Sequence, residues 1–141
     1  MVNNPWLVVA GALSAAASLA HLAIIVGGAP WYRFFGAGER MARMAEARSP
    51  RPTVITLGIA AVLAAWAAYG FAGAGLIAPL PLMRPALVAI SAVYLVRGLA
   101  PVPVLLATQG RVSPFWAWSS LIVLAFGTAY AVGTWWAWAG L

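Results

Sequence analysis

Residues 83–106 read MRPALVAISAVYLVRGLAPVPVLL, an apolar run as long as a membrane span that carries an arginine, Arg97, in its interior. A helix needs about 20 apolar residues to cross the ~30 Å hydrocarbon core of a bilayer. Three further runs of this kind accompany it, at about residues 5–27, 53–76 and 114–138. The sequence therefore predicts an all-α integral membrane protein, a bundle of four transmembrane helices that forms one domain over residues 1–141.

The composition excludes several classes of function. Of the 141 residues, 65% are hydrophobic and 7% are charged, whereas a soluble domain carries about 25% charged residues. The chain has no cysteine, which excludes disulfides, thiol catalysis and cysteine-ligated metals or clusters. Its single histidine excludes a histidine-rich metal or haem site within one chain. No catalytic, metal or nucleotide motif is complete, so we expect neither a metal nor a cofactor.

The positive charges predict how the helices are oriented. The net charge of +6 comes from eight arginines opposed by two glutamates, and we expect these arginines to contact lipid headgroups rather than nucleic acid. Loop 28–52 holds five of them and the third loop holds Arg111, whereas the opposite side has only Arg84. Because cytoplasmic loops carry the excess of arginine and lysine, both of these loops are predicted to be cytoplasmic and both termini to lie on the outer side.

The interfacial loop 28–52 has helical character between residues 36 and 48. Glu39 and Arg43 are spaced i,i+4, and Arg43 and Glu46 are spaced i,i+3, so these side chains can form an ion-pair ladder on one face. This pattern predicts a short amphipathic helix that lies in the cytoplasmic headgroup region. Aromatic residues are expected to anchor its start there, namely Trp31, Tyr32, Phe34 and Phe35.

Each predicted transmembrane helix has one face of small or weakly polar residues. Examples are Ser14 and Ser18 in the first helix, and Gly127 and Thr134 in the fourth. Small residues let helices approach closely within a membrane, so these faces are predicted to meet in the bundle. The glycine- and alanine-rich outer faces are also compatible with a homo-oligomer.

Arg97 is the first candidate for function, and its position depends on how the third helix ends. If that helix continues to Leu106, Arg97 lies ~15 Å from the cytoplasmic end, and its burial without a partner costs at least ~2.5–3.5 kcal/mol. If the helix breaks near Ala100, because Pro101 and Pro103 interrupt its hydrogen bonds, Arg97 extends to the headgroups. Both alternatives remain open.

Other polar residues are predicted to share the cytoplasmic half with Arg97. Histidine is a common proton carrier in proteins; His21 is either a proton-transfer group or a packing residue that makes an interhelical hydrogen bond. Glu39 either folds inward toward Arg97 or a substrate, or belongs to the surface ladder. Arginines beside a lipid-accessible cavity can bind a carboxylate or phosphate. The predicted ligand-binding residues are His21, Tyr94, Arg97, Glu39 and Arg40.

The segment Trp31–Met41, WYRFFGAGERM, resembles a signature of small, uncharacterised four-helix proteins of the bacterial inner membrane. The resemblance extends over most of the chain. It implies a multi-pass protein of that membrane but no particular activity.

The overall layout also resembles the membrane-associated eicosanoid and glutathione metabolism family. Proteins of that family have a similar length, four helices, outward termini and a basic first cytoplasmic loop, and the resemblance implies a trimer that binds glutathione and apolar substrates. The family's arginine- and glutamate-bearing motif is echoed here by Glu39, Arg40, Arg43 and Glu46. Two departures weigh against it: the characteristic asparagine is missing, and Pro50 and Pro52 intervene before the second helix.

Three functions are compatible with these observations. The first, which we expect, is the binding of a membrane lipid or other apolar small molecule in a cytoplasmic-leaflet pocket, with its polar end near His21, Tyr94 and Arg97. The second is a membrane enzyme of the glutathione-transferase type, in which Arg43 holds an anionic co-substrate. The third is an oligomeric ion or proton pathway that uses His21 and Arg97. A purely assembling or scaffolding role is compatible as well.

Overall fold

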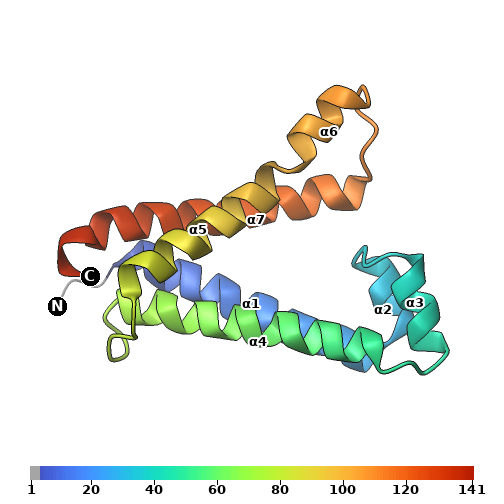
Figure 1. Cartoon of the computed structure of the whole chain (residues 1–141), viewed down its shortest axis with the longest axis horizontal. Coiled ribbons are helices and arrows are strands. Elements are labelled where there is room, and N and C mark those ends of the chain that lie inside the picture. The colour runs from blue at the N-terminus through green and yellow to red at the C-terminus, as the bar shows by residue number, and fades with distance from the viewer. Residues whose placement is uncertain (1–3) are drawn as a thin grey trace. The chain divides into compact units, whose positions relative to one another are not determined.

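The computed structural model describes residues 4–141, which form helices and turns without a strand. Four helical segments are long and apolar enough to cross a membrane (Figure 1), namely Pro5–Gly27, Arg51–Gly73, Met83–Ala107 and Pro114–Gly140. The shortest have 23 residues and are therefore about 35 Å long, which exceeds the ~30 Å hydrocarbon core. The prediction of an all-α fold with four such helices is confirmed, and the chain is that of a multi-pass membrane protein.

Helix α1, Pro5–Gly27, begins at a cap formed by Asn4. The Asn4 side-chain oxygen accepts a hydrogen bond from the backbone N–H of Leu7 at 3.2 Å, which satisfies a donor that has no partner within the helix. The Asn4 side-chain amide donates to the carbonyl oxygen of Gly133 at 2.7 Å. Because Gly133 belongs to α7, Pro114–Ala137, this cap also joins the start of α1 to α7.

Helix α4, Arg51–Gly73, is displaced toward the N-terminus relative to the predicted span 53–76. The prediction treated the prolines before it as helix breakers, but Pro52 lies in the first turn, where a missing N–H leaves no hydrogen bond unmade. The helix ends early because Gly75 adopts a φ of 79° and the N–H of Leu76 bonds to the carbonyl of Phe71 at 2.9 Å. This is the Schellman motif that terminates many helices.

Helix α5, Met83–Leu99, and helix α6, Pro101–Ala107, replace the single helix predicted over residues 83–106. Prolines 101 and 103 supply no N–H, and a proline ring clashes with the preceding helical turn. The helical path therefore bends at Ala100 (Figure 1). The alternative with a break near Ala100 is the one found, and Arg97 lies in the last turn of α5.

The chain forms two compact units. Unit 1 comprises the described part of Met1–Ser14 together with Trp66–Leu141, and unit 2 comprises Ala15–Ala65. Helices α1 and α4 contribute residues to both units. Unit 1 also contains α5, α6, α7 and the short 3-10 helix η1, Trp138–Gly140. Unit 2 also contains two short helices, α2, Ala29–Phe34, and α3, Glu39–Glu46.

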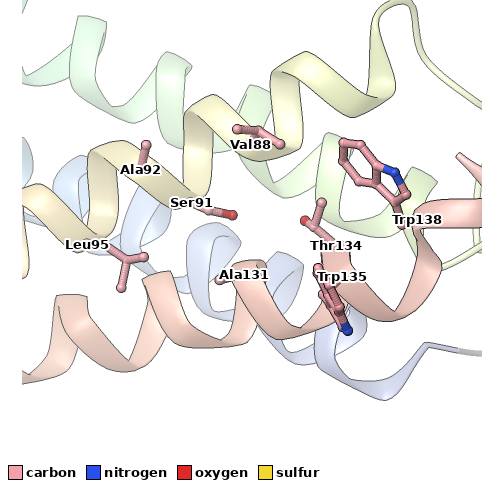
Figure 2. A pocket seen from close by; sticks show the side chains of 8 residues that line it. All are labelled: Val88, Ser91, Ala92, Leu95, Ala131, Thr134, Trp135 and Trp138. Atoms are coloured by element: carbon pink, nitrogen blue, oxygen red, sulfur yellow. The ribbon is translucent and has the colours of Figure 1, made fainter.

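Glycines let α5 and α7 pack backbone to backbone in unit 1. A Cβ atom on Gly98 would lie 2.9 Å from the backbone nitrogen of Leu124, and one on Gly127 would lie 3.0 Å from that of Leu95. The small-residue faces predicted for these two helices meet here, as expected for close helix packing in membranes. Nearer the start of α5, the two helices leave a pocket between them (Figure 2).

Helices α2 and α3 of unit 2 pack against each other over a small apolar cluster. Its buried members are Ile24, Ala29, Tyr32 and Ala42. The Tyr32 hydroxyl lies 3.1 Å from the hydroxyl of Thr56 on α4, which links this cluster to a transmembrane helix. Helix α2 was not predicted because residues 28–52 were expected to be a loop with helical character only between residues 36 and 48, whereas Pro30 occupies the first turn of α2.

Candidate functional site

Arg97 is held in place by two serines of α7. Its Nη1 donates to the Ser120 hydroxyl at 2.7 Å, and its Nη2 donates to the Ser119 hydroxyl at 3.3 Å. Both partners are neutral, and none of the ion pairs formed among residues 4–141 includes Arg97. A guanidinium group has five N–H donors, so three remain for other acceptors. The cation is therefore positioned, but no carboxylate neutralises it within this part of the chain.

A shallow, open apolar groove of about 510 Å³ runs along one face of α5 and begins beside Arg97. Its other lining residues are Ala92, Val93, Val96 and Ala100. The two valines are exposed, and the groove reaches the bend between α5 and α6. The Arg97 side chain thus borders an apolar face of α5, so that a cation lies beside apolar surface on which an amphiphilic ligand can rest.

Tyr94, although only one turn from Arg97, belongs to the core of unit 1. Its hydroxyl lies 2.7 Å from that of Ser14, which lies 3.1 Å from the hydroxyl of Tyr130. Tyr130 donates to the carbonyl of Trp66 at 2.8 Å, so Tyr94 donates to Ser14 and Ser14 donates to Tyr130. The ring of Tyr94 also stacks on that of Tyr130, with centroids 5.6 Å apart. This closed chain of hydrogen bonds leaves the Tyr94 hydroxyl no role in the groove.

His21 makes a local contact in unit 2. Its Nδ1–H donates to the carbonyl of Ala17 at 2.7 Å, one turn earlier on α1. The interhelical hydrogen bond considered for this histidine is absent among residues 4–141. Of the five predicted site residues, Tyr94 and Arg97 share α5 in unit 1, whereas His21, Glu39 and Arg40 belong to unit 2.

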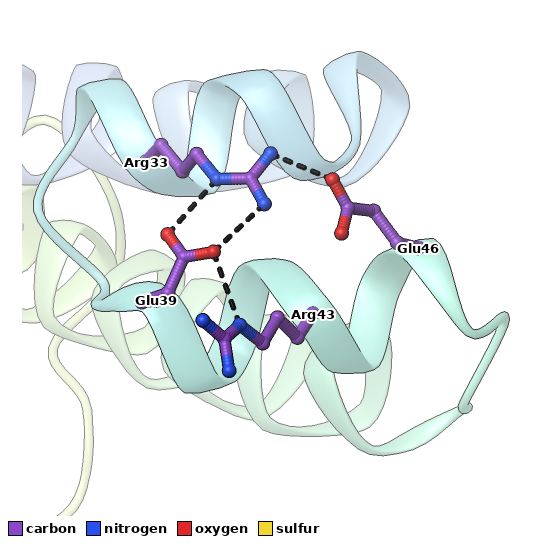
Figure 3. Close-up of polar contacts among 4 residues, drawn as sticks. All are labelled: Arg33, Glu39, Arg43 and Glu46. Atoms are coloured by element: carbon purple, nitrogen blue, oxygen red, sulfur yellow. Dashed lines mark hydrogen bonds and ion pairs between the residues drawn. The ribbon is translucent and has the colours of Figure 1, made fainter.

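Arg33 of α2 is the centre of an ion-pair cluster with the two glutamates of α3 (Figure 3). Its Nε and Nη2 donate to the two carboxylate oxygens of Glu39 at 3.0 and 2.9 Å, and its Nη1 donates to Glu46 at 2.7 Å. The predicted pair of Glu39 and Arg43 is confirmed at 3.3 Å. The predicted pair of Arg43 and Glu46 is wrong, because the packing of α2 against α3 brings Arg33 to Glu46 instead. Glu39 thus lies in the surface ladder.

We expect this cluster to weaken in acid. Hydrogen bonds from the Arg33 guanidinium hold the pKa of both Glu39 and Glu46 below their ordinary value. Since an unfolded glutamate titrates near ~4.3, the stabilisation is complete above that pH and is lost as the pH falls through the lower folded-state pKa. Both carboxylates are about half exposed, so the effect is modest.

NMR chemical shifts of the Glu39 and Glu46 carboxyl carbons, followed from pH 7 to pH 2 in micelles, measure these pKa values directly. In the Arg33→Gln variant both midpoints should move upward, toward that of an ordinary glutamate. Midpoints that are the same in the variant and the wild type would show that Arg33 does not hold these carboxylates.

Arg40 lines a shallow depression on the outer face of α3. The neighbouring lining residues include Glu39, Arg43 and Met44, all from the same short helix. Among residues 4–141, no group of three or more histidine, aspartate or glutamate residues could hold a metal ion. The depression is therefore one charged helix face.

Sequence reasoning missed three residues that build these contacts. Ser119 and Ser120 hold Arg97, although the only sequence signal was a pair of hydroxyls near the start of the fourth helix. Arg33 was counted only as a topology signal. Each of these roles depends on which helices pack together, which the pattern of apolar residues does not specify.

The fold and this geometry define a four-span helical membrane protein with a serine-held arginine at an apolar groove. Comparison with protein-family models, curated proteins and solved structures gives no match to the chain. The resemblances drawn from the sequence therefore stay predictions.

Proposed function

We propose that this protein binds an anionic membrane lipid, with the lipid phosphate at Arg97 and an acyl chain in the adjoining groove. One observation carries the proposal: a guanidinium group that Ser119 and Ser120 hold in place lies at an apolar groove and has no ion-pair partner among residues 4–141. The lipid completes this arrangement because it supplies both an anion and an apolar chain.

The physical chemistry of arginine favours a phosphate at this position. A cation among apolar side chains is unfavourable until an anion and hydrogen bonds compensate it. The planar guanidinium group binds phosphate through two parallel N–H···O bonds, and the serines leave donors free for them. Because these serines already restrict the Arg97 side chain, less conformational entropy is lost when the phosphate binds.

The proposed location is the bacterial inner membrane, with the segment between α1 and α4 facing the cytoplasm and both termini outside. The support is the arginine bias: Arg33, Arg40, Arg43, Arg48 and Arg51 cluster at this segment, and Arg111 follows α6. In this orientation α3 rests in the headgroup region and Arg97 faces the inner leaflet. The inner leaflet is where anionic lipids make the surface potential negative.

Lipid binding is favoured over the other functions that the sequence allows. Arg43, the expected ligand of an anionic co-substrate, has a side chain that is 76% exposed and paired with Glu39. His21, the expected proton carrier, bonds within its own helix. Neither contact supports an enzyme or a proton pathway, whereas the groove at Arg97 has both features of an amphiphile site.

Native mass spectrometry tests the proposal with equal amounts of phosphatidylglycerol and phosphatidylcholine added to the solubilised protein. We expect the wild type to retain phosphatidylglycerol preferentially. In Arg97→Leu this preference should fall by about ten- to a hundredfold, which is the change in affinity expected when hydrogen bonds to a charged group are lost. Arg97→Lys should keep part of this preference, because lysine retains the positive charge but lacks the planar guanidinium group that forms two parallel hydrogen bonds with a phosphate.

The matched control is Arg111→Leu, which removes an exposed arginine outside the groove. This variant should retain the wild-type preference. An Arg97→Leu protein that selects phosphatidylglycerol as the wild type does, or an equal loss in both variants, would reject the groove as the binding site.

A further inference from the structure

A second pocket, of about 300 Å³, lies between α5 and α7 near the start of α5 (Figure 2). Val88 and Leu95 supply apolar lining from α5, and Trp135 and Trp138 lie at the α7 end. Arg97 does not line this pocket. The pocket and the groove proposed above share Ala92, but this pocket extends to α7 whereas the groove extends to Arg97.

The hydroxyl of Thr134 points into this pocket without a hydrogen-bond partner. Thr134 is 4% exposed, and its oxygen is the one buried side-chain polar atom without a partner within residues 4–141. A helical threonine commonly bonds to the carbonyl one turn earlier, as Thr128 does with Leu124 at 2.8 Å. Thr134 departs from this pattern, and a buried hydroxyl without a partner is unfavourable. The unused donor indicates that a ligand oxygen belongs here.

Ser91 faces Thr134 across the pocket but does not satisfy it. Figure 2 shows the two hydroxyl oxygens directed toward each other from α5 and α7. Ser91 donates its proton to the carbonyl of Leu87 at 2.7 Å, and its oxygen, although a hydroxyl can also accept, makes no hydrogen bond with Thr134. The free donor in the pocket is therefore that of Thr134, which suits a ligand group that accepts a single hydrogen bond, such as an ester carbonyl.

A cation lies next to the pocket. Arg84, in the first turn of α5, places its Cζ 5.3 Å from the ring centroid of Trp138, one of the lining residues. No ion pair among residues 4–141 includes Arg84. Arg84 precedes Ser91 by about 10 Å along the helix axis. The cation at the start of α5 thus lies next to a pocket that contains the free Thr134 hydroxyl of α7 and apolar side chains.

We infer that this pocket binds an ester-linked anionic glycerophospholipid in the leaflet opposite to that of Arg97. The phosphate pairs with Arg84, the acyl-ester carbonyl accepts the hydrogen bond from Thr134, and the chain continues past Leu95. The glycerol backbone joins phosphate and ester, so one lipid supplies both the anion for Arg84 of α5 and the acceptor for Thr134 of α7. An ether lipid has the same phosphate but lacks the carbonyl.

Competition between diacyl phosphatidylglycerol and its dialkyl-ether analogue tests this inference by native mass spectrometry. We expect the wild type to prefer the ester lipid by about fivefold, the worth of one hydrogen bond. Thr134→Val, which keeps the shape of the side chain and removes the donor, should abolish that preference. Equal binding of the two lipids by the wild type, or an ester preference that persists in Thr134→Val, would overturn the inference.

Two further variants separate this site from the one at Arg97. Arg97→Leu should keep the ester preference, because it leaves Thr134 and Arg84 intact. Arg84→Gln should lower the retention of diacyl phosphatidylglycerol relative to phosphatidylcholine in the Arg97→Leu background. Loss of the ester preference in Arg97→Leu, or unchanged retention in Arg84→Gln, would contradict a second, independent site.

Discussion

Replacing Tyr130 by alanine is expected to reduce the stability of the solubilised protein by about 3–5 kcal/mol, as truncation of a buried aromatic residue does elsewhere. Tyr130 is fully buried. Its ring stacks on that of Tyr94, and its hydroxyl connects Ser14 to the carbonyl of Trp66. The alanine variant loses both the packing and the hydrogen bonds, so the contacts among α1, α4, α5 and α7 weaken together.

Unfolding in mixed micelles of increasing denaturing detergent, followed by circular dichroism, measures this change. Tyr130→Phe should lie between the wild type and Tyr130→Ala, because it keeps the ring but leaves the Trp66 carbonyl without its partner. Trp118→Ala removes an aromatic residue from α7 that is 68% exposed, and should cost much less. Similar losses in Trp118→Ala and Tyr130→Ala would mean that the tyrosine cluster is not the core of unit 1.

Gly70→Ala is expected to destabilise the protein by about 1–3 kcal/mol, although it adds only one methyl group. A Cβ atom at Gly70 would lie 2.8 Å from Cα and 2.9 Å from the backbone nitrogen of Gly11. These atoms belong to the backbone of α1 and cannot rotate away as a side chain can. Relief of the clash therefore requires α1 and α4 to separate.

Gly58→Ala is the matched control on the same helix, because a Cβ atom at Gly58 meets nothing within 4 Å. Alanine forms helix more readily than glycine, so this variant should be as stable as the wild type or slightly more stable. Thermal unfolding of the two variants side by side distinguishes the cases. A Gly70→Ala protein as stable as Gly58→Ala would rule out the close contact between α1 and α4.

The transmembrane helices could be predicted because length and apolar composition nearly suffice to define a span. The ends of these helices were less predictable, because the same residue type can either terminate a helix or begin one. Residues 28–52 were predicted to be a loop, yet Pro30 and Pro52 each lie in the first turn of a helix, where a proline costs no hydrogen bond. The pair Asn4 and Pro5 carried a usable signal, a capping residue followed by proline. No sequence signal predicted the hydrogen bond from Asn4 to Gly133, because this bond depends on tertiary packing.

The candidate site was predicted only in part. Arg97 was identified because a charge within an apolar run is costly. Its partners were not identified, because Ser119 and Ser120 reach it only through the register of α7 against α5. Tyr94 was assigned to the same site because it was predicted to share the cytoplasmic half of the bundle with Arg97, whereas its hydroxyl bonds to Ser14 in the core. Polarity marks a candidate residue, but helix packing decides what that residue contacts.

The most direct test of the proposed function is solid-state NMR of the protein in phosphatidylglycerol bilayers, with arginine labelled by ¹⁵N. The measurement is the dipolar coupling between the lipid ³¹P and the Arg97 guanidinium nitrogens, whose signals are assigned from their loss in Arg97→Lys. We predict a coupling as strong as that of a directly hydrogen-bonded phosphate. An Arg97 signal that shows no ³¹P coupling in these bilayers would contradict lipid binding at Arg97.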